Sequence, residues 1–190
     1  MTPEALIAAL HTADKLKDTT RHCYTEGGRH ESVAEHSWRL ALAAYWVADE
    51  FPEADMNKVI KMCLIHDLGE CFIGDIPTFA KTDADEAREE AELMAWVRSL
   101  PEPVSGEMEA LYREMIALET PEAKLYKAMD KLEAIVQHNE SDIATWEPHE
   151  YQLNMTYADD AVAWSPVLRE LREAIRNDTK AKIAAAEQQA

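Results

Sequence analysis

Residues 66–70 read His66-Asp67-Leu68-Gly69-Glu70, and they follow an apolar stretch whose period is typical of an α-helix. The pattern predicts a helix over residues 57–70. His66, Asp67 and Glu70 then share one face at its C-terminal end, because residues three and four positions apart are neighbours on a helix. The buried face is expected to consist of Val59, Ile60, Cys63 and Leu64.

Two distant side chains complete a candidate metal site around this pair. His36 precedes the pair in the chain and Asp130 follows it. Two imidazoles and two carboxylates form a mixed nitrogen and oxygen set, which suits Mn²⁺, Co²⁺, Fe²⁺, Ni²⁺ or Zn²⁺ better than Ca²⁺. The dipeptide alone is weak evidence, and the full set is what predicts a divalent metal.

The composition favours one helical domain. The chain has 190 residues, of which 47% are hydrophobic and only five are glycine. This length accommodates one sizeable core, and abundant Ala, Glu, Leu, Lys and Met favour helices over strands. We therefore expect a single all-α domain over residues 1–176, with the motifs in residues 16–141 and a frayed tail at residues 177–190.

Local signals divide the chain into helices and two polar loops. Thr2-Pro3 is typical of a helix start, and Ser32 with Glu35 forms a capping box that opens a helix to about Asp49. Loops are expected at residues 17–31 and 74–82. Residues 142–164 show no clear period and are expected to be irregular, with room for one helix. The remaining helices are expected at residues 84–100, 106–118, 121–141 and 166–176.

The charge excludes several classes of partner. A net charge of -18 repels nucleic-acid polymers and anionic membrane surfaces. A small anionic substrate requires local positive charge, which a bound metal supplies. Cys23, Cys63 and Cys71 are odd in number and lack a CxxC pattern, which favours a reducing cytoplasm. The longest apolar run, residues 41–48, is too short to span a bilayer.

The motifs resemble a known family when they are taken together. They are Glu35-His36, His66 to Glu70, Gly-Asp-Ile-Pro-Thr at residues 74–78 and Lys-Ala-Met-Asp at residues 127–130. Their order is similar to that of the HD-domain metal-dependent phosphohydrolases, and among these to the bacterial 5′-deoxynucleotidases and their eukaryotic HD-domain-containing relatives. The resemblance covers residues 16–141. It implies an all-α HD-domain helical bundle, an enzyme and a homodimer.

The resemblance also implies a role for each matching residue. His36, His66, Asp67 and Asp130 match the metal ligands, and Glu70 and Asp75 match the catalytic carboxylates. Arg21 matches the residue that orients the phosphate, which agrees with the planar fork of a guanidinium. Contacts to the substrate are expected from Arg21, His22, Asp75, Ile76, Pro77, Thr78 and Lys81.

Simpler interpretations stand beside these roles. His36 on its own is typical of a satisfied helix histidine, and Arg21 on its own is typical of a surface ion pair in an acidic chain. The acidic run at residues 83–92 is interpreted as a solvated helix face. The tryptophans are assigned to the core or an interface, and surface positions are assigned to His11, His30, His138 and His149.

Two further features refine the expected activity. No histidine lies between Asp67 and Asp130, which predicts one metal ion per chain and argues against the cyclic-dinucleotide phosphodiesterases and dinuclear oxygenases of the superfamily. His22 stands where the bacterial deoxynucleotidases have a tryptophan associated with excluding ribose. Selectivity for a deoxy sugar therefore stays open.

The expected function is metal-dependent hydrolysis of nucleoside 5′-monophosphates, chiefly 2′-deoxy, to nucleoside and phosphate. One alternative is an HD phosphohydrolase that acts on a nucleoside di- or triphosphate or on a sugar phosphate. Another is a nucleotide-sensing regulator without turnover. Glu70 and Asp75 weigh against the regulator, because a pure binding site does not need carboxylates that handle protons.

Overall fold

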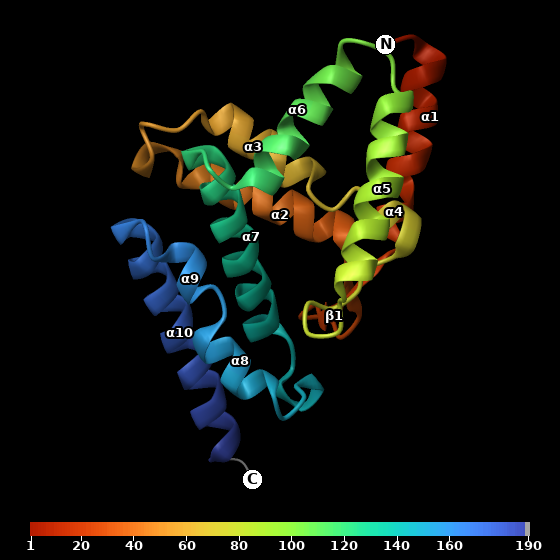
Figure 1. Cartoon of the computed structure of the whole chain (residues 1–190). Helices are drawn as coiled ribbons and strands as arrows, with labels where there is room; N and C mark the ends of the chain where they lie inside the picture. Colours follow the sequence, from red (N-terminus) through yellow and green to blue (C-terminus); the bar gives the residue numbers. More distant parts are fainter. Residues whose placement is uncertain (189–190) are drawn as a thin grey trace.

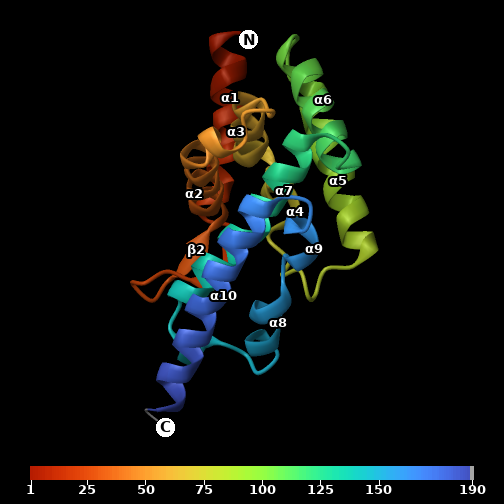
Figure 2. The same cartoon turned by 90° about the vertical axis from the view of Figure 1, so that its left-hand side faces the viewer.

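The computed structural model describes residues 1–188, and α-helices make up most of it (Figures 1 and 2). Three short 3₁₀-helices and a two-stranded sheet complete the described part: η1 Asp14–Lys17, η2 Ala48–Glu50, η3 Ile143–Thr145, β1 Thr20–Tyr24 and β2 His30–Ser32. The α-helices are α1 Pro3–Ala13, α2 Val33–Trp46, α3 Met56–Ile65, α4 Glu70–Ile73, α5 Asp83–Ser99, α6 Val104–Ala117, α7 Pro121–Glu140, α8 Glu150–Thr156, α9 Asp159–Val162 and α10 Pro166–Glu187. The all-α prediction is confirmed.

The side-chain caps predicted from the sequence are present at the starts of α1 and α2. The Thr2 hydroxyl accepts a hydrogen bond from the amide of Ala5, and Pro3 occupies the first turn of α1. Ser32 and Glu35 form both bonds of a capping box at the start of α2. These caps satisfy amides that have no partner inside the helix. Helix α2 ends at Trp46, before the expected end, and η2 follows it.

Helices α2, α3 and α7 pack on one another and form the centre of the core. Leu40, Met62 and Leu132 are at most 1% exposed. Burial of a leucine or methionine side chain contributes about 2 kcal/mol. The expected buried face of α3 is partly wrong, because Leu64 is 50% exposed and Met62 packs inside instead. One apolar cluster runs from Leu16 to Ile175, so the core is continuous.

A small hairpin replaces the loop that was expected at residues 17–31. Strands β1 and β2 are antiparallel, with Thr20 opposite Ser32 and Tyr24 opposite His30. The register advances four residues on β1 and two on β2, so β1 carries a bulge, which breaks the usual alternation of side chains between the two faces. The Gln137 amide donates to the Tyr24 carbonyl oxygen at 2.7 Å and holds this hairpin against α7.

The helix predicted over residues 57–70 is divided in two. Helix α3 ends at Ile65, residues 66–69 form turns, and α4 begins at Glu70. His66 is the C-cap of α3. His66 and Asp67 therefore lie at a break between two helices, and the prediction of one helical face for His66, Asp67 and Glu70 is wrong.

The C-terminal helix extends beyond the predicted boundary at residue 176. Helix α10 continues to Glu187, and Thr179 is fully buried. The Thr179 hydroxyl donates to the Asn139 side-chain oxygen at 3.0 Å, which joins the last turns of α10 to α7. The prediction of a frayed tail is therefore wrong for residues 177–187. Residues 189–190 of that tail lie outside the described residues.

Residues 142–164 contain more helix than predicted, namely η3, α8 and α9. Arg172 of α10 is 2% exposed and donates to the carbonyl oxygens of Tyr157 and Asn154, both at 2.9 Å. This long-range contact holds α8 and α9 against α10, and periodicity cannot reveal such an interaction. Figure 1 shows α8, α9 and α10 on one side of α7 and the α5–α6 pair on the other.

Candidate metal centre and pocket

Side chains from α2, α7 and the α3–α4 break converge on one point. His36 Nε2 lies 3.2 Å from His66 Nε2 and 3.1 Å from Asp130 Oδ1. Asp67 Oδ2 lies 2.9 Å from His66 Nε2 and 3.7 Å from His36 Nε2. The helices that bring these residues together are those of the central core, so packing fixes the geometry of the cluster.

The hydrogen bonds of the two imidazoles show that Nε2 of each ring faces the cluster. His66 Nδ1 lies 2.9 Å from the carbonyl oxygen of Cys63, and a carbonyl oxygen only accepts, so Nδ1 carries the hydrogen. His36 Nδ1 bonds in the same way to the carboxylate of Glu133. The two Nε2 atoms and two carboxylates are directed at one point, where the negative charge of Asp67 and Asp130 favours a cation, either a proton on a ring nitrogen or a metal ion. The donor set therefore fits a divalent metal.

The electrostatics of the cluster agree with a cation site. Burial opposes a charge on His66, but Asp67 and Asp130 outweigh this effect and raise the pKa of His66 to about 10. Burial also works against ionisation of Asp67, yet His66 lowers the pKa of Asp67 to about 2. Despite its burial, Asp130 has a pKa well below its usual value because Lys127 and His66 lie beside it. Both carboxylates are therefore ionised and ready to bind a cation.

Glu70 has a different environment from these carboxylates. It is 7% exposed, and its Oε2 has no hydrogen-bond partner. Burial and the negative charges of Asp67 and Asp75 raise the pKa of Glu70 to about 10. A buried carboxyl group that retains its proton is suited to donate it to a reacting oxygen.

Asp75 lies on the loop that follows α4. Gly74 ends this helix with a φ of 82°, a conformation that favours glycine, and directs the chain into the pocket. Burial raises the pKa of Asp75, and Arg21 partly offsets the effect. Farther along the loop, Lys81 forms an ion pair with Glu89 at 2.6 Å.

Arg21 is neither a free guanidinium nor a surface ion pair. Its side chain is 15% exposed, and its Nη1 lies 3.3 Å from Glu31 Oε2 and 3.6 Å from Glu133 Oε2. Burial opposes its charge, but Glu133 and Glu31 raise the pKa of Arg21. The guanidinium is therefore held in position by buried acids at the wall of the pocket.

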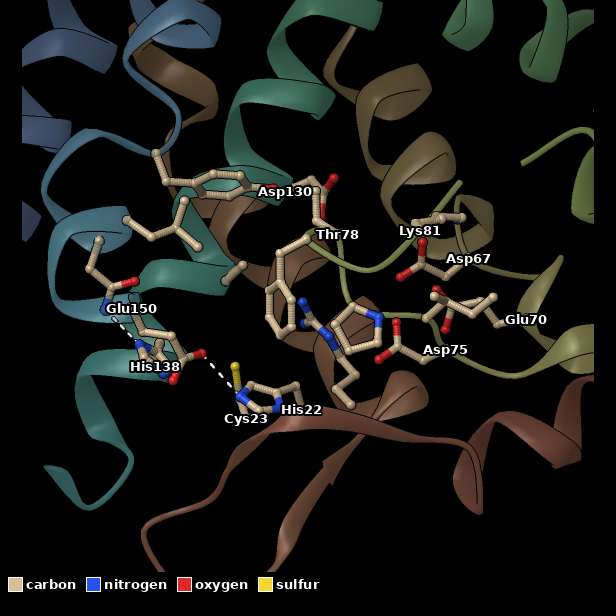
Figure 3. A pocket seen from close by; sticks show the side chains of 18 of the residues that line it. His22, Cys23, Asp67, Glu70, Asp75, Thr78, Lys81, Asp130, His138 and Glu150 are labelled. Carbon is tan, nitrogen blue, oxygen red and sulfur yellow. Dashed lines mark hydrogen bonds and ion pairs between the residues drawn. The ribbon is translucent and has the colours of Figure 1, made fainter. Parts of the chain in front are cut away.

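One pocket of about 200 Å³ joins these groups (Figure 3). The bulge in β1 lets three consecutive side chains, Arg21, His22 and Cys23, line it. Figure 3 shows Asp67, Glu70 and Asp75 at one end, and His22, His138 and Glu150 at the other. His36 and His66 do not line the pocket. All the other residues predicted to form the site do: Arg21, His22, Asp67, Glu70, Asp75, Ile76, Pro77, Thr78, Lys81 and Asp130.

Helix α7 contributes a row of pocket residues that sequence reasoning largely missed. Lys127, Asp130, Ala134 and His138 follow one another at spacings of three and four, so they lie on one helical face. The Lys127 ammonium lies 2.8 Å from Asp130 Oδ2. The surface assignment of His138 is wrong, because this residue is 6% exposed and stacks on Trp146.

Other missed residues come from α7 and α8. Glu133 is 5% exposed and bonds to His36, and its position three residues after Asp130 was the only available signal. Glu150, Leu153, Asn154 and Tyr157 line the pocket from the segment that lacked periodicity. Among residues 1–188, no helix has the length and apolar character needed to cross a membrane.

Comparisons with known proteins agree with the resemblance. A model of the HD domain matches residues 13–172. The human 5′-deoxynucleotidase HDDC2 is 29% identical over 152 residues, which cover 78% of this chain and 74% of that protein. The Bos taurus protein of the same name is 31% identical and covers 71% and 67%. A solved structure from Magnetospirillum magnetotacticum, titled a predicted metal-dependent phosphohydrolase, is 28% identical with a TM-score of 0.78 and covers 94% and 93%.

Proposed function

The chain belongs to the HD domain family, and we propose that it is a metal-dependent 5′-nucleotidase that hydrolyses nucleoside 5′-monophosphates, chiefly 2′-deoxyribonucleotides. The observation that carries the proposal is the meeting of four candidate metal ligands beside a pocket that Glu70, Asp75 and Arg21 line. The relatives named 5′-deoxynucleotidase support the reaction and the class of substrate. One domain carries all of these groups.

One divalent ion per chain is part of the proposal, held by His36, His66, Asp67 and Asp130. A mixed nitrogen and oxygen set favours Mn²⁺, Co²⁺ or a similar ion. Such an ion supplies positive charge beside the phosphoryl oxygens and makes water more acidic. Among residues 67–130 no histidine is available for a second ion, which supports the count of one.

The chain's own residues position the substrate and move its protons. Arg21 binds the phosphate oxygens, and the buried acids behind it keep its planar fork oriented. Lys81 and Lys127 add positive charge against a net charge of -18. The backbone amides of Ile76 and Thr78 donate to the same phosphate, and the side chains of Thr78 and Phe79 border the pocket.

Two carboxyl groups have complementary roles in the proposed reaction. Glu70 holds a proton in its buried site and delivers it to the 5′-oxygen as the phosphorus–oxygen bond breaks. Asp75 orients the attacking water on the side of the phosphate that faces the loop. The products are a nucleoside and inorganic phosphate.

A homodimer and a cytoplasmic location complete the proposal. Trp38 and Tyr45 lie two turns apart on the same side of α2 and are 61% and 65% exposed, and Trp46 beside them is 71% exposed. Large apolar side chains that are exposed close together are typical of an interface. The three cysteines, an odd number without a CxxC pattern, support a reducing compartment.

Phosphate release from a panel of nucleotides tests the proposed activity. Deoxy- and ribonucleoside mono-, di- and triphosphates are assayed with Mn²⁺, Co²⁺, Mg²⁺ and Zn²⁺ in turn, and the monophosphates are expected to react. Glu70→Gln is expected to lose activity while keeping its metal, whereas His66→Ala is expected to lose both. Release from di- or triphosphates alone would favour the alternative phosphohydrolase, and release from none would overturn the proposal.

A further inference from the structure

A second pocket, of about 270 Å³, lies between α9 and α10 and shares no lining residue with the pocket beside the candidate metal centre. The two helices lie side by side (Figures 1 and 2). Three arginines, two acids and one apolar side chain line this second pocket: Arg169, Arg172, Arg176, Asp159, Glu173 and Val162. None of them takes part in the proposed reaction.

The three arginines lie on one face of α10. Arg169, Arg172 and Arg176 are separated by three and four residues, and residues at these spacings are neighbours on a helix. Like charges at such spacings repel one another. The lining residues carry three positive and two negative charges, which is an excess of one positive charge in a chain whose net charge is -18. The second pocket is therefore a local site of positive charge.

The two acids of this pocket neutralise only part of the arginine face. Asp159 Oδ1 lies 3.0 Å from Arg172 Nε and 2.5 Å from Arg176 Nη2. Glu173 pairs with Arg176 and, at 3.6 Å, with Lys180. The ion pairs of Asp159 hold α9 on α10, and they use both helices' charges for packing.

The other donors of the arginine face are not explained by packing. Arg169 donates to the Ala163 carbonyl oxygen at 2.7 Å, and within the described residues it forms no ion pair. Arg172 donates to the carbonyl oxygens of Tyr157 and Asn154, but its Nη1 is buried and has no hydrogen-bond partner among the described residues. Buried donors without a partner are rare in folded proteins. Ion pairs within the protein thus do not account for the whole cluster.

The charge of Arg172 is incompletely balanced as well. The side chain is 2% exposed. Burial and the neighbouring Arg176 lower the pKa of Arg172, and Asp159 only partly opposes them. A further negative charge in the pocket would offset both effects.

A phosphate group fits the chemistry of this pocket. A guanidinium matches phosphate oxygens with two parallel hydrogen bonds, and three guanidiniums line the pocket. A carboxylate is a weaker candidate, since Asp159 already supplies one. The net charge of -18 repels nucleic-acid polymers and anionic membranes, so the phosphate group is expected on a small molecule.

We propose that Arg169, Arg172 and Arg176 form a second site, which binds a phosphate group outside the pocket beside the candidate metal centre. Arg172 also links the two pockets, because Asn154 and Tyr157, whose carbonyl oxygens it binds, line the first one. Binding at the second site therefore affects the wall of the first. Inorganic phosphate, a product of the proposed reaction, is one source of such a group, and a nucleotide is another.

Titration with inorganic phosphate, followed in the backbone ¹H–¹⁵N NMR spectrum, tests the second site. The full chain is used as the Arg21→Gln variant without added metal, so that phosphate binding in the first pocket is weakened. Saturable shifts are expected for the amides of α9 and of residues 166–176. Adding Arg169→Gln is expected to raise the Kd about tenfold, the effect of losing one charged hydrogen bond. Adding Arg98→Gln removes a guanidinium that is 62% exposed and paired with Glu109, and it is expected to leave the Kd unchanged.

Two further measurements make the titration decisive. Arg169 is exposed, so its replacement is expected to leave the protein folded, and Arg176→Gln is a second variant expected to weaken binding in the same direction. Sodium chloride at matched ionic strength is the control for screening of charge. Shifts that chloride reproduces, or a Kd that neither variant changes, would overturn the proposal.

Two more probes identify the source of the phosphate group. Adenosine 5′-monophosphate is expected to shift the same amides if the site accepts a phosphate ester, and adenosine, which lacks the group, is expected to shift none of them. Shifts with inorganic phosphate alone would assign the site to the free ion. Shifts with adenosine, or no shift with either phosphate compound, would refute a phosphate site.

The amides of Met155 and Ala158 report on the link between the pockets. They belong to the same peptide groups as the carbonyl oxygens that Arg172 binds, so they are expected to shift with the same Kd as the amides of α10. Signals that stay in place for both residues while the α10 amides shift would refute the link. This titration measures binding alone, so a protein that releases no phosphate from any nucleotide gives the same result.

Discussion

Replacement of Glu133 by glutamine tests whether a buried carboxylate prepares His36 for metal binding. Glu133 lies one turn after Asp130 on α7 and is 5% exposed. Its carboxylate accepts from His36 Nδ1 and, at 2.5 Å, from Arg39 Nε. Glutamine preserves the size of the side chain but replaces one acceptor oxygen with a donor NH₂ group. The hydrogen on His36 Nδ1 then has a weaker partner, and the orientation and basicity of Nε2 are no longer fixed.

The expected loss follows from the role of such a partner. Removing the hydrogen-bond partner of a metal-binding histidine typically weakens metal affinity by about 10- to 100-fold. A tenfold change in Kd corresponds to about 1.4 kcal/mol. Glu133→Gln retains one acceptor oxygen and is expected near the tenfold end of this range. Glu133→Ala also leaves Arg39 with one carboxylate fewer and is expected nearer the hundredfold end.

Competition with a chelator gives the Kd for Mn²⁺ or Zn²⁺ in each variant. Glu140→Gln is the matched control, because Glu140 also bonds to Arg39 but is half exposed and does not contact His36. It is expected to keep the affinity of the wild type. Equal metal affinity in Glu133→Gln and the wild type would refute the role assigned to this carboxylate.

Three further predictions concern proton binding, stability and assembly. In metal-free protein the folded state holds the Glu70 proton up to about pH 10 against an ordinary pKa of 4.5, so the free energy of unfolding is expected to fall as pH rises through that window. Glu70→Gln is expected to flatten this slope in urea titrations, and an unchanged slope would contradict the assignment. Thr179→Val is expected to lower the free energy of unfolding by about 1 kcal/mol through loss of its bond to Asn139, measured by the same titrations; no loss would mean that the last turns of α10 add no stability. Trp46→Glu is expected to give a monomer in sedimentation velocity, and a wild-type monomer would refute the dimer.

Local chemistry explains the parts of the fold that the sequence predicted well. Caps at Thr2 and Ser32 depend on residues within one turn, and both are present. Helices α5, α6 and α7 begin and end within about two residues of the predicted limits, because their apolar periods and flanking prolines are local signals as well.

Interactions across the chain explain what the sequence could not predict. The break after Ile65 lies in a stretch with a continuous helical pattern. The order of α8 depends on Arg172, a residue that comes later in the chain and gave no sign of burial. His138 and Glu150 pair across α7 and α8, and neither has a local signature. For the same reason, the candidate metal ligands could be proposed only because several spaced motifs occurred together.

The row of pocket residues on α7 has a consequence for how this chain can vary. Asp130 and His138 are eight residues apart, so the helix separates them by about 12 Å along its axis. One rigid element thus sets the spacing between the candidate metal centre and the end of the pocket that His138 lines. Inserting a single residue between Asp130 and His138 would rotate the two ends by about 100° relative to each other. We therefore expect active relatives to keep the length of α7. The loop at residues 74–82 is expected to vary in length, which would fit the pocket to other small phosphates at the same spacing.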